Sequence, residues 1–270
     1  MKENIQEIKR RLFDGTVEIS EKEIKMLQQD ERKGVQKLLV TWQKQQQKRT
    51  EQKRKYIEMS TYEEQLSQQG KYLVAGVDEA GRGPLAGPVV AGAVILNKDF
   101  PLLGLNDSKQ LTENIRETFF DEIYKHAEAV GVGIVSAPEI DRLNIYQAAR
   151  HAMVQAVNAL QKTPHHILVD AMKLPITTPQ TSIIKGDSRS VSIAAGSIIA
   201  KVTRDRLMKE LHEKYPQYGF SRHFGYGTAE HLKNLERYGA CEAHRRSFAP
   251  VKQWSDNGSQ GQAGTFGREA

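Results

Sequence analysis

Three apolar stretches of the sequence end in carboxylates, and together they supply four acids that could work at one site. Asp78 and Glu79 follow the first stretch, Asp170 closes the second, and Asp187 comes after the third. Because functional sites gather at strand ends in open α/β sheets, we expect the four side chains to converge. Oxygen donors without cysteines or clustered histidines suit the hard cations Mg²⁺ and Mn²⁺. Two such ions can hold the attacking water and the leaving oxygen of a phosphodiester displacement.

The turn after the first two acids contains Gly81 and Gly83. Adjacent strand residues point to opposite faces, so we expect the backbone to turn at Asp78 and Glu79 for both carboxylates to reach one site. The glycine spacing imitates a dinucleotide-binding fingerprint, but that fingerprint must open a helix. Two prolines and a second β-branched apolar run, residues 89–96, predict a strand there instead.

Each acidic position also has a plain structural interpretation. A lone Asp-Glu pair is commonly a solvated turn, and a single strand that ends in Asp is commonplace. Three strands that end in acids are hard to attribute to chance. The repetition therefore favours a functional site over three unrelated turns.

Further motifs lie in and after the first strand. They read DEAGRGPLAGP (78–88), LNDSK (105–109), a block from KGD (185–187) to KVTRD (201–205), HFGYGT (223–228) and RRSF (245–248). These motifs closely resemble those of the type 2 ribonucleases H, the ribonuclease HII family. The resemblance covers residues 72–254, and it is specific because the motifs recur in order along the whole segment.

The resemblance implies the catalytic and metal-binding roles of the acids. Asp78, Glu79, Asp170 and Asp187 match the family's four catalytic acids, with Asp78 expected between two ions of Mg²⁺ or Mn²⁺. The implied reaction is endonucleolytic hydrolysis of the RNA strand in an RNA/DNA hybrid, or of duplex DNA on the 5′ side of an embedded ribonucleotide. It leaves 3′-hydroxyl and 5′-phosphate ends.

The resemblance also implies the substrate contacts. Gly81, Arg82 and Gly83 match residues that contact the ribose 2′-hydroxyl, and Tyr226 matches the residue that stacks on the neighbouring deoxyribose. Lys109 is a further expected substrate contact. Glycines suit this task because a chain without Cβ lets backbone amides approach a sugar closely.

Two other classes of protein remain open at this stage. A DNA-cutting resolvase or transposase with a ribonuclease H-like fold would share the acids but not the combination of Gly81, Arg82 and Gly83 with Tyr226. A non-catalytic hybrid-binding module would keep a basic surface and tolerate the loss of an acid. All four acids are present in this sequence.

The fold expected to position these residues is a single α/β domain of the ribonuclease H-like type, a mixed sheet flanked by helices. Helices are predicted at residues 112–126, as one long helix over 136–160, at 192–214 and at 228–239. The aromatic and basic segment 218–228 is expected to be a loop, serving either as packing or as a platform for bases and sugars. Arg245, Arg246 and Lys252 are expected to face phosphates.

Residues 1–70 have a different composition, rich in Gln, Lys, Arg and Glu and free of proline, which predicts a helical extension. Ser20 and Glu23 form a capping box that opens a second helix. Residues 32–55 contain nine basic residues and one acid, Glu51. Such a segment is either a solvated helix or a nucleic-acid-binding element that neutralises successive phosphates.

Composition narrows the remaining possibilities. The chain has 270 residues, a formal net charge of +6 and one cysteine, Cys241, which excludes an internal disulfide and favours the cytoplasm. Its apolar runs are too short to span a bilayer, so no membrane association is expected. We predict a basic helical extension at 1–70, a catalytic domain at 71–254, a disordered tail at 255–270, and a monomer.

Overall fold

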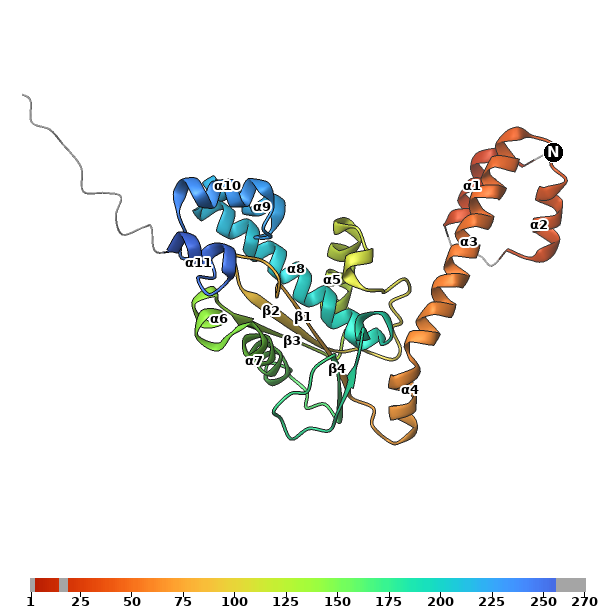
Figure 1. Cartoon of the computed structure of the whole chain (residues 1–270). Helices are drawn as coiled ribbons and strands as arrows, with labels where there is room; N and C mark the ends of the chain where they lie inside the picture. Colours follow the sequence, from red (N-terminus) through yellow and green to blue (C-terminus); the bar gives the residue numbers. More distant parts are fainter. Residues whose placement is uncertain (1–2, 15–18, 256–270) are drawn as a thin grey trace, which may run out of the picture. The chain divides into compact units, whose positions relative to one another are not determined.

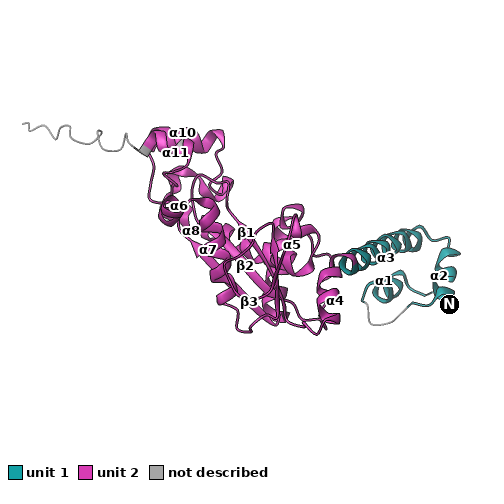
Figure 2. Cartoon of the chain, turned by 60° about the horizontal axis from the view of Figure 1, so that its bottom comes forward, with its two compact units in different colours: residues 1–57 teal, residues 58–270 magenta. Residues whose placement is uncertain are grey.

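The chain forms two compact units in a computed structural model that describes residues 3–14 and 19–255. They are the N-terminal unit, Met1–Ile57, and the C-terminal unit, Glu58–Ala270 (Figure 2). The domain boundary expected near residue 70 stays a prediction. The disordered tail predicted from residue 255 onward falls on residues 256–270, which lie outside the described residues.

The N-terminal unit consists of α1 (Ile5–Phe13), α2 (Glu21–Gln28) and most of α3 (Lys33–Met59). The predicted capping box is confirmed, because Ser20 Oγ accepts from Glu23 N–H while the Glu23 carboxylate accepts from Ser20 N–H. The three helices share a small apolar core. Its buried members are Ile8, Leu12, Leu27, Val35 and Leu39.

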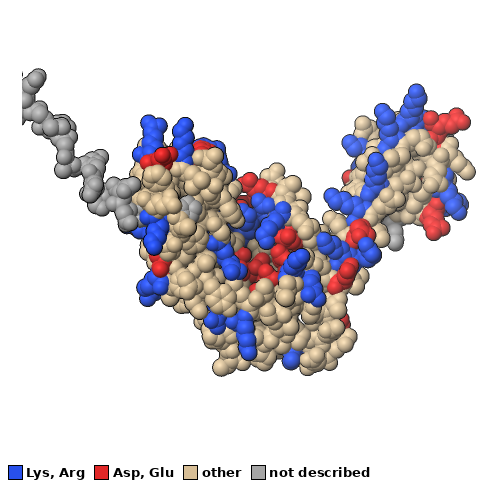
Figure 3. Space-filling model, viewed as in Figure 1, with Lys and Arg blue, Asp and Glu red and all other residues tan. Residues whose placement is uncertain are grey.

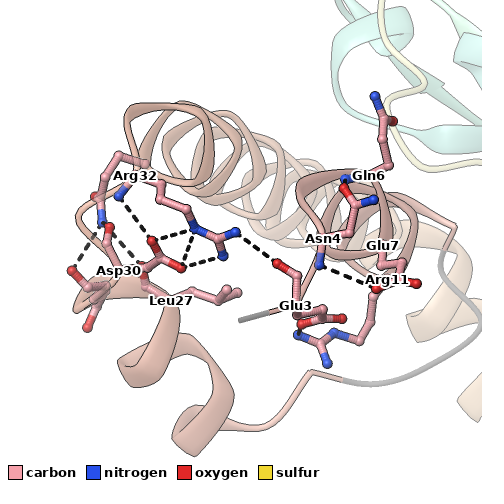
Figure 4. A network of polar contacts seen from close by, with 10 residues as sticks. Glu3, Asn4, Gln6, Glu7, Arg11, Leu27, Asp30 and Arg32 are labelled. Carbon is pink, nitrogen blue, oxygen red and sulfur yellow. Dashed lines mark hydrogen bonds and ion pairs between the residues drawn. The ribbon is translucent and has the colours of Figure 1, made fainter. Parts of the chain in front are cut away.

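A polar network ties the chain segments that precede α1 and α3 (Figure 4). Arg32 pairs with Asp30 at 2.6 Å and also donates to the Glu3 carbonyl at 2.8 Å. Arg11 of α1 pairs with the Glu3 carboxylate at 2.9 Å. Gln36 of α3 donates to the Asp30 carbonyl. These contacts fix how α1, α2 and the start of α3 pack within the unit.

A five-stranded mixed sheet lies at the centre of the C-terminal unit (Figure 1), as the family resemblance implies. Its order is β3-β2-β1-β4-β5. The strands are β1 (Val74–Ala80), β2 (Val89–Ile95), β3 (Ala129–Val135), β4 (His166–Asp170) and β5 (Gln180–Ile183). β1, β2 and β3 pair antiparallel, whereas β1, β4 and β5 pair parallel.

Helices cover both faces of this sheet (Figure 1). α8 packs on one face, and α7 packs on the other. The helices of the unit are α4 (Thr61–Gln68), α5 (Glu113–His126), α6 (Ala137–Leu143), α7 (Ile145–Asn158), α8 (Val191–Lys214), α9 (Phe220–His223), α10 (Ala229–Tyr238) and α11 (Ala249–Ser255). Short 3₁₀ turns lie at η1 (Ser108–Gln110), η2 (Gly186–Ser188) and η3 (Pro216–Tyr218).

The approach of α8 to the sheet depends on residues without side chains. A Cβ on Gly76 of β1 would lie 1.9 Å from the Ser192 carbonyl carbon, so no other residue fits there. Short side chains at Ala194, Ala195 and Ser197 are buried on the helix. This close packing brings the N-terminal half of α8 against the acidic strands.

The prediction of one long helix over residues 136–160 is wrong in one respect, because the segment forms two helices, α6 and α7. Asn144 separates them with φ at +67°, a left-handed value that asparagine tolerates better than most residues. The Asn144 side chain then accepts from Gln147 N–H and caps α7. The apolar spacing continues across the break, which is why periodicity alone did not reveal it.

Among residues 3–14 and 19–255, no helix is both long enough and apolar enough to cross a membrane.

Candidate active site

The sheet register places Asp78 and Asp170 next to each other. β1 and β4 run parallel with Val77 opposite Val169, so the residues that follow are neighbours across the two strands. Side chains two residues apart in a strand share a face, and Gly76 of β1 faces α8. Asp78 therefore points toward α8, where Ser197 lies close enough to lower the pKa of its carboxyl in part.

Asp187 reaches the same place by a different route from the one predicted. β5 ends at Ile183, and Asp187 lies in the short turn η2 rather than at the end of a strand. Lys185, with φ at +55°, reverses the chain between them. Gly186 N–H then donates to Asp170 Oδ1 at 2.7 Å, which links η2 to the end of β4.

The backbone turn predicted at Asp78 and Glu79 is wrong. β1 continues to Ala80, and Glu79 stays paired with Ala91 because the ladder with β2 is unbroken there. Glu79 N–H donates to Asp78 Oδ1 at 2.7 Å, and its carboxylate lies 3.3 Å from Arg82 Nη1. The chain turns only at Gly81.

Burial and mutual repulsion act on these acids. Burial raises the pKa of Asp78 well above its usual range, and the charges of Glu79 and Asp170 add to the rise. Burial also raises the pKa of Glu79, against the opposing effect of Arg82. Burial, Asp107 and Asp170 raise the pKa of Asp187. The negative charges of these acids therefore repel one another, and Arg82 and Lys109 offset only part of that repulsion.

The donor set fits a divalent cation. All candidate ligands are carboxylates, and Glu79 Oε2 is buried without a hydrogen-bond partner among the described residues. A cation would relieve the repulsion that raises the pKa values of these acids. Over residues 3–14 and 19–255, however, no three His, Cys, Asp or Glu side chains already stand in a metal-binding arrangement. The site thus suits a divalent cation by its charge and its oxygen donors, whereas the described side chains do not yet form a complete coordination geometry.

Lys109 supplies positive charge at the edge of this group. Its Nζ lies 3.7 Å from Asp187 Oδ2, and most of its side chain is exposed. Asp107 Oδ1 accepts from Lys109 N–H and fixes the turn η1 that carries it. An exposed cation beside buried acids is placed to meet an anionic substrate.

The structure places two of the predicted substrate residues, Gly83 and Tyr226, close to each other. A Cβ built on Gly83 would lie 3.7 Å from Cε1 of the Tyr226 ring, so the turn and the aromatic residue are neighbours. Tyr226 is 50% exposed, and its neighbour Gly227 packs near Leu85. Gly81 has φ at +93°, and a Cβ there would collide with Arg204, so this turn requires glycine.

The prediction that Arg245 faces phosphates is wrong. Arg245 is completely buried and donates to four backbone carbonyls. The acceptors are the carbonyls of Gly81, Arg82, Gly87 and Pro88, at 2.6 to 3.1 Å. Arg245 therefore sets the shape of the glycine turn from beneath.

Arg204 of α8 does the same from the other side. It is 1% exposed and donates to the carbonyls of Ala86, Pro88 and Phe224. Through Phe224 it joins the glycine turn to the segment that carries Tyr226. Sequence reasoning missed this residue, since its partners are backbone carbonyls that every residue possesses.

A chain of buried histidines fixes the Tyr226 segment further. Cys241 N–H donates to His244 Nδ1, so the proton of neutral His244 is on Nε2, which lies 3.0 Å from His231 Nε2. His231 then carries its proton on Nδ1 and donates to the Tyr226 carbonyl at 2.9 Å. Burial lowers the pKa of His231 and lowers that of His244 to about 3, so both rings are neutral.

The predicted aromatic loop is largely packing. Residues 218–228 begin at the last residue of η3 and contain α9, and Tyr218 and Phe220 are buried in a cluster with Ala86 and Met208. His223 is also buried and donates to the Tyr218 carbonyl while its Nδ1 accepts from Gly225 N–H. Burial excludes Tyr218 and Phe220 as a platform, and the platform role of the half-exposed Tyr226 stays a prediction.

The surface agrees with this picture. Figure 3 shows acidic side chains gathered on one face of the C-terminal unit with Lys and Arg around them. A mixed β-sheet whose neighbouring strands bring carboxylates together beneath a basic rim is the architecture of a ribonuclease H-like nuclease.

Comparison with known proteins gives the family. A model described as Ribonuclease HII matches residues 75–251, and one described as Ribonuclease HII N-terminal domain matches residues 4–67. The chain belongs to the ribonuclease HII family. It is therefore an endoribonuclease, a phosphodiester hydrolase that acts on RNA/DNA hybrids.

Individual relatives agree. Ribonuclease HII of Bacillus mycoides (strain KBAB4) is 60% identical over 227 residues, which cover 84% of this chain and 88% of the relative. Ribonuclease HII of Bacillus cytotoxicus is 56% identical over 243 residues, covering 90% and 93%. The crystal structure of ribonuclease H2 from Pyrococcus horikoshii OT3 matches with a TM-score of 0.61 at 30% identity, covering 68% of this chain and 97% of that one.

Proposed function

We propose that the chain cuts duplex nucleic acid on the 5′ side of a ribonucleotide, including a single ribonucleotide within DNA, and leaves 3′-hydroxyl and 5′-phosphate ends. Asp78, Glu79, Asp170 and Asp187 hold Mg²⁺ or Mn²⁺. When bound, two ions would supply the charge that activates water and stabilises the leaving 3′-oxygen. The raised pKa values of Asp78 and Glu79 support this assignment, because a cation returns both groups to their charged forms.

The protein's own residues orient the substrate. Tyr226 stacks on the sugar next to the ribonucleotide, while the backbone at Gly81 to Gly83 meets the 2′-hydroxyl. Lys109 approaches the phosphate and offsets the negative charge of Asp187. Arg245 holds the carbonyls of Gly81 and Arg82, so the turn does not need to reorganise when substrate binds.

The contact between Gly83 and Tyr226 carries the proposal. A Cβ on Gly83 would come within 3.7 Å of the half-exposed Tyr226 ring, so a backbone that admits a sugar lies next to an aromatic residue, in the turn that follows Asp78 and Glu79. A 2′-hydroxyl distinguishes the two kinds of sugar and can both donate and accept a hydrogen bond. A general DNA nuclease has no need for this pairing.

The test is cleavage of two matched duplexes in Mg²⁺ and in Mn²⁺, one all-DNA and one with a single ribonucleotide. We expect cleavage of the second alone, at the 5′ side of the ribonucleotide. Because the backbone amides aimed at the 2′-hydroxyl would be left unpaired, the all-DNA duplex should be resistant. Similar rates on both duplexes would refute ribonucleotide sensing and favour a resolvase-like enzyme.

We further propose that the protein acts as a monomer in the cytoplasm. The single cysteine, Cys241, supports a reducing compartment, because no internal disulfide is possible. Sedimentation equilibrium at several protein concentrations measures the mass directly, and a concentration-dependent dimer would contradict the monomer.

A further inference from the structure

One side of α3 carries a line of lysines. They are Lys33, Lys37, Lys44, Lys48 and Lys55. Their separations alternate between four and seven residues, and at 3.6 residues per turn such positions stay within about 60° of one another around the helix. At 1.5 Å per residue the line is about 33 Å long. We call these five residues the lysine face.

The lysine face is opposite the side of α3 that packs. Val35 and Leu39 are buried against α1 and α2, and Trp42 is partly buried beside them. Lys33, Lys37, Lys44 and Lys48 are exposed, and over the described residues the structure gives none of them a salt bridge. Figure 3 shows Lys and Arg side chains projecting from the N-terminal unit. The face is thus held on a folded unit but has no partner within it.

Glu51 of α3 interacts electrostatically with Lys55, but Lys33, Lys37, Lys44 and Lys48 have no salt bridge within the described part of the helix. Glu51 is the only acid between Lys33 and Lys55, and it pairs with Arg54 at 2.7 Å. Like charges four residues apart repel each other along a helix, as in the pairs Lys33 with Lys37 and Lys44 with Lys48. A line of uncompensated charge on a rigid helix is complementary to a polyanion.

We propose that the lysine face binds the sugar–phosphate backbone of duplex nucleic acid without regard to sequence. A duplex carries one charge per roughly 1.7 Å of its axis, so a line of about 33 Å meets several phosphates at once. A protein partner fits less well, because the cores of protein interfaces are apolar and depleted in lysine. This inference takes its partner class from the proposed function but does not depend on cleavage.

The test compares two full-length variants with equal loss of charge. In the face variant, Lys33, Lys37, Lys44 and Lys48 become Gln. In the control variant, four exposed cations of α1 and α2 become Gln; they are Lys9, Arg10, Lys22 and Lys25. Gln and Lys have similar helix propensities, so both variants keep the fold, which circular dichroism checks.

Binding to an all-DNA duplex is measured by fluorescence anisotropy in EDTA at several salt concentrations. Each lost phosphate contact lowers the slope of log affinity against log salt by about 0.9. We expect the face variant to lose about two to four units of slope and the control variant less than about one. Equal losses would show a general charge effect and overturn the proposal, and so would an unchanged slope in the face variant, which would leave an acidic protein as the partner.

Cleavage of the single-ribonucleotide duplex is measured on the same proteins. If the parent cuts this duplex and the face variant keeps the parent's salt slope, the proposal for the lysine face is wrong and the proposed function stands. If the face variant loses salt slope but the parent does not cut this duplex, the proposed function is wrong and the proposal for the lysine face stands. At saturating substrate the face variant should keep the parent's turnover, because none of its substitutions lies in the C-terminal unit.

Discussion

The two units use charged side chains in opposite ways. Arg204 and Arg245 of the C-terminal unit are buried, and their guanidinium groups donate hydrogen bonds to backbone carbonyls. Lys37 and Lys44 of the N-terminal unit are exposed, and their ammonium groups form no hydrogen bond or ion pair with the described residues. A buried cation shapes the protein itself, whereas an exposed cation remains available to a partner.

The acids follow the same division. Asp78 is 4% exposed, and its charge is costly until a cation arrives. Glu21 of α2, by contrast, is exposed to solvent. The C-terminal unit therefore contains buried charges that the fold holds at a cost, whereas the N-terminal unit contains exposed charges that cost the fold little.

The largest effect is expected from removing one of the acids of the candidate site. Asp78→Asn, Asp170→Asn and Asp187→Asn should each lower turnover on the single-ribonucleotide duplex by orders of magnitude, because a lost ligand disturbs both water activation and the leaving group. Glu21→Gln, the exposed control, should leave turnover unchanged. Near-normal turnover of the Asp187 variant would remove that residue from the site.

The stability of the Asp78→Asn protein sharpens the same point. Because burial raises the pKa of Asp78, its negative charge destabilises the fold above that pKa, and the penalty disappears as the pH falls toward the unfolded value near 4. In EDTA at neutral pH, the variant should unfold at a higher temperature than the parent. The gain should shrink as the pH approaches 4, and calorimetry at both pH values decides this.

The next effect concerns a buried cation. Arg245→Met should lower the free energy of unfolding by about 3 kcal/mol or more, because four carbonyls lose their charged donor inside the protein. Lys44→Met should change it by less than about 0.5 kcal/mol, as an exposed substitution with little propensity cost. Urea denaturation measures both.

Arg245→Lys guards against a variant that fails to fold. It keeps the charge but not the planar fork, so we expect an intermediate loss of stability. Full stability in the Met variant would mean that solvent satisfies these carbonyls and that Arg245 is not a scaffold residue.

The sequence revealed features that depend on neighbouring residues more readily than features that depend on tertiary packing. The apolar runs of β1, β2 and β4 and the capping box at Ser20 and Glu23 were predictable, because they depend on local spacing and local hydrogen bonds. The break at Asn144 was not, since both helices bury the same side and the apolar spacing continues through it.

The candidate site divides along the same line. The resemblance identified the acids and the glycine turn, and the register of β1 and β4 makes Asp78 and Asp170 neighbours. The sequence could not show that Arg245 is buried, because a charged residue type does not indicate burial and the hydrogen-bond acceptors of Arg245 are backbone carbonyls. The chain of His231 and His244 was likewise hidden, since packing alone brings these two residues together.

A moderate effect is expected from acid. Burial, reinforced by the charge of His231, lowers the pKa of His244 to about 3, whereas an unfolded histidine titrates near 6.5. The stability that neutral His244 contributes is complete above pH 6.5 and is lost as the pH falls toward 3. His244→Gln should therefore flatten the fall of unfolding free energy between pH 6.5 and 4, by up to about 1.4 kcal/mol per pH unit.

An exposed histidine provides the control for this prediction. His151 of α7 is exposed, so His151→Gln makes the same substitution outside the buried histidine chain. Urea denaturation at a series of pH values compares all three proteins. If His244→Gln follows the parent curve, acid acts elsewhere and the neutral histidine chain does not set the acid limit.

The smallest effect is expected at Tyr226, which tests whether an exposed residue of the C-terminal unit also serves a partner. Tyr226→Ala should lower the rate on the single-ribonucleotide duplex roughly tenfold, because one stacking contact is worth about 1 to 3 kcal/mol. Tyr146→Ala, at a residue of α7 with similar exposure, should change nothing in the cleavage assay.

Two further measurements separate stacking from folding at Tyr226. The free energy of unfolding should fall only slightly, since half of the ring is in solvent and its backbone stays fixed through His231. The salt dependence of duplex binding should match the parent, because an aromatic contact releases no counterion, whereas the lysine-face variant changes that dependence and keeps its turnover. A Tyr226 variant with normal rate would leave the 2′-hydroxyl to be sensed by the glycine turn alone. In that case, removing the 2′-hydroxyl from the substrate would still abolish cleavage, because the backbone amides at Gly81 to Gly83 would lose their partner regardless of the ring.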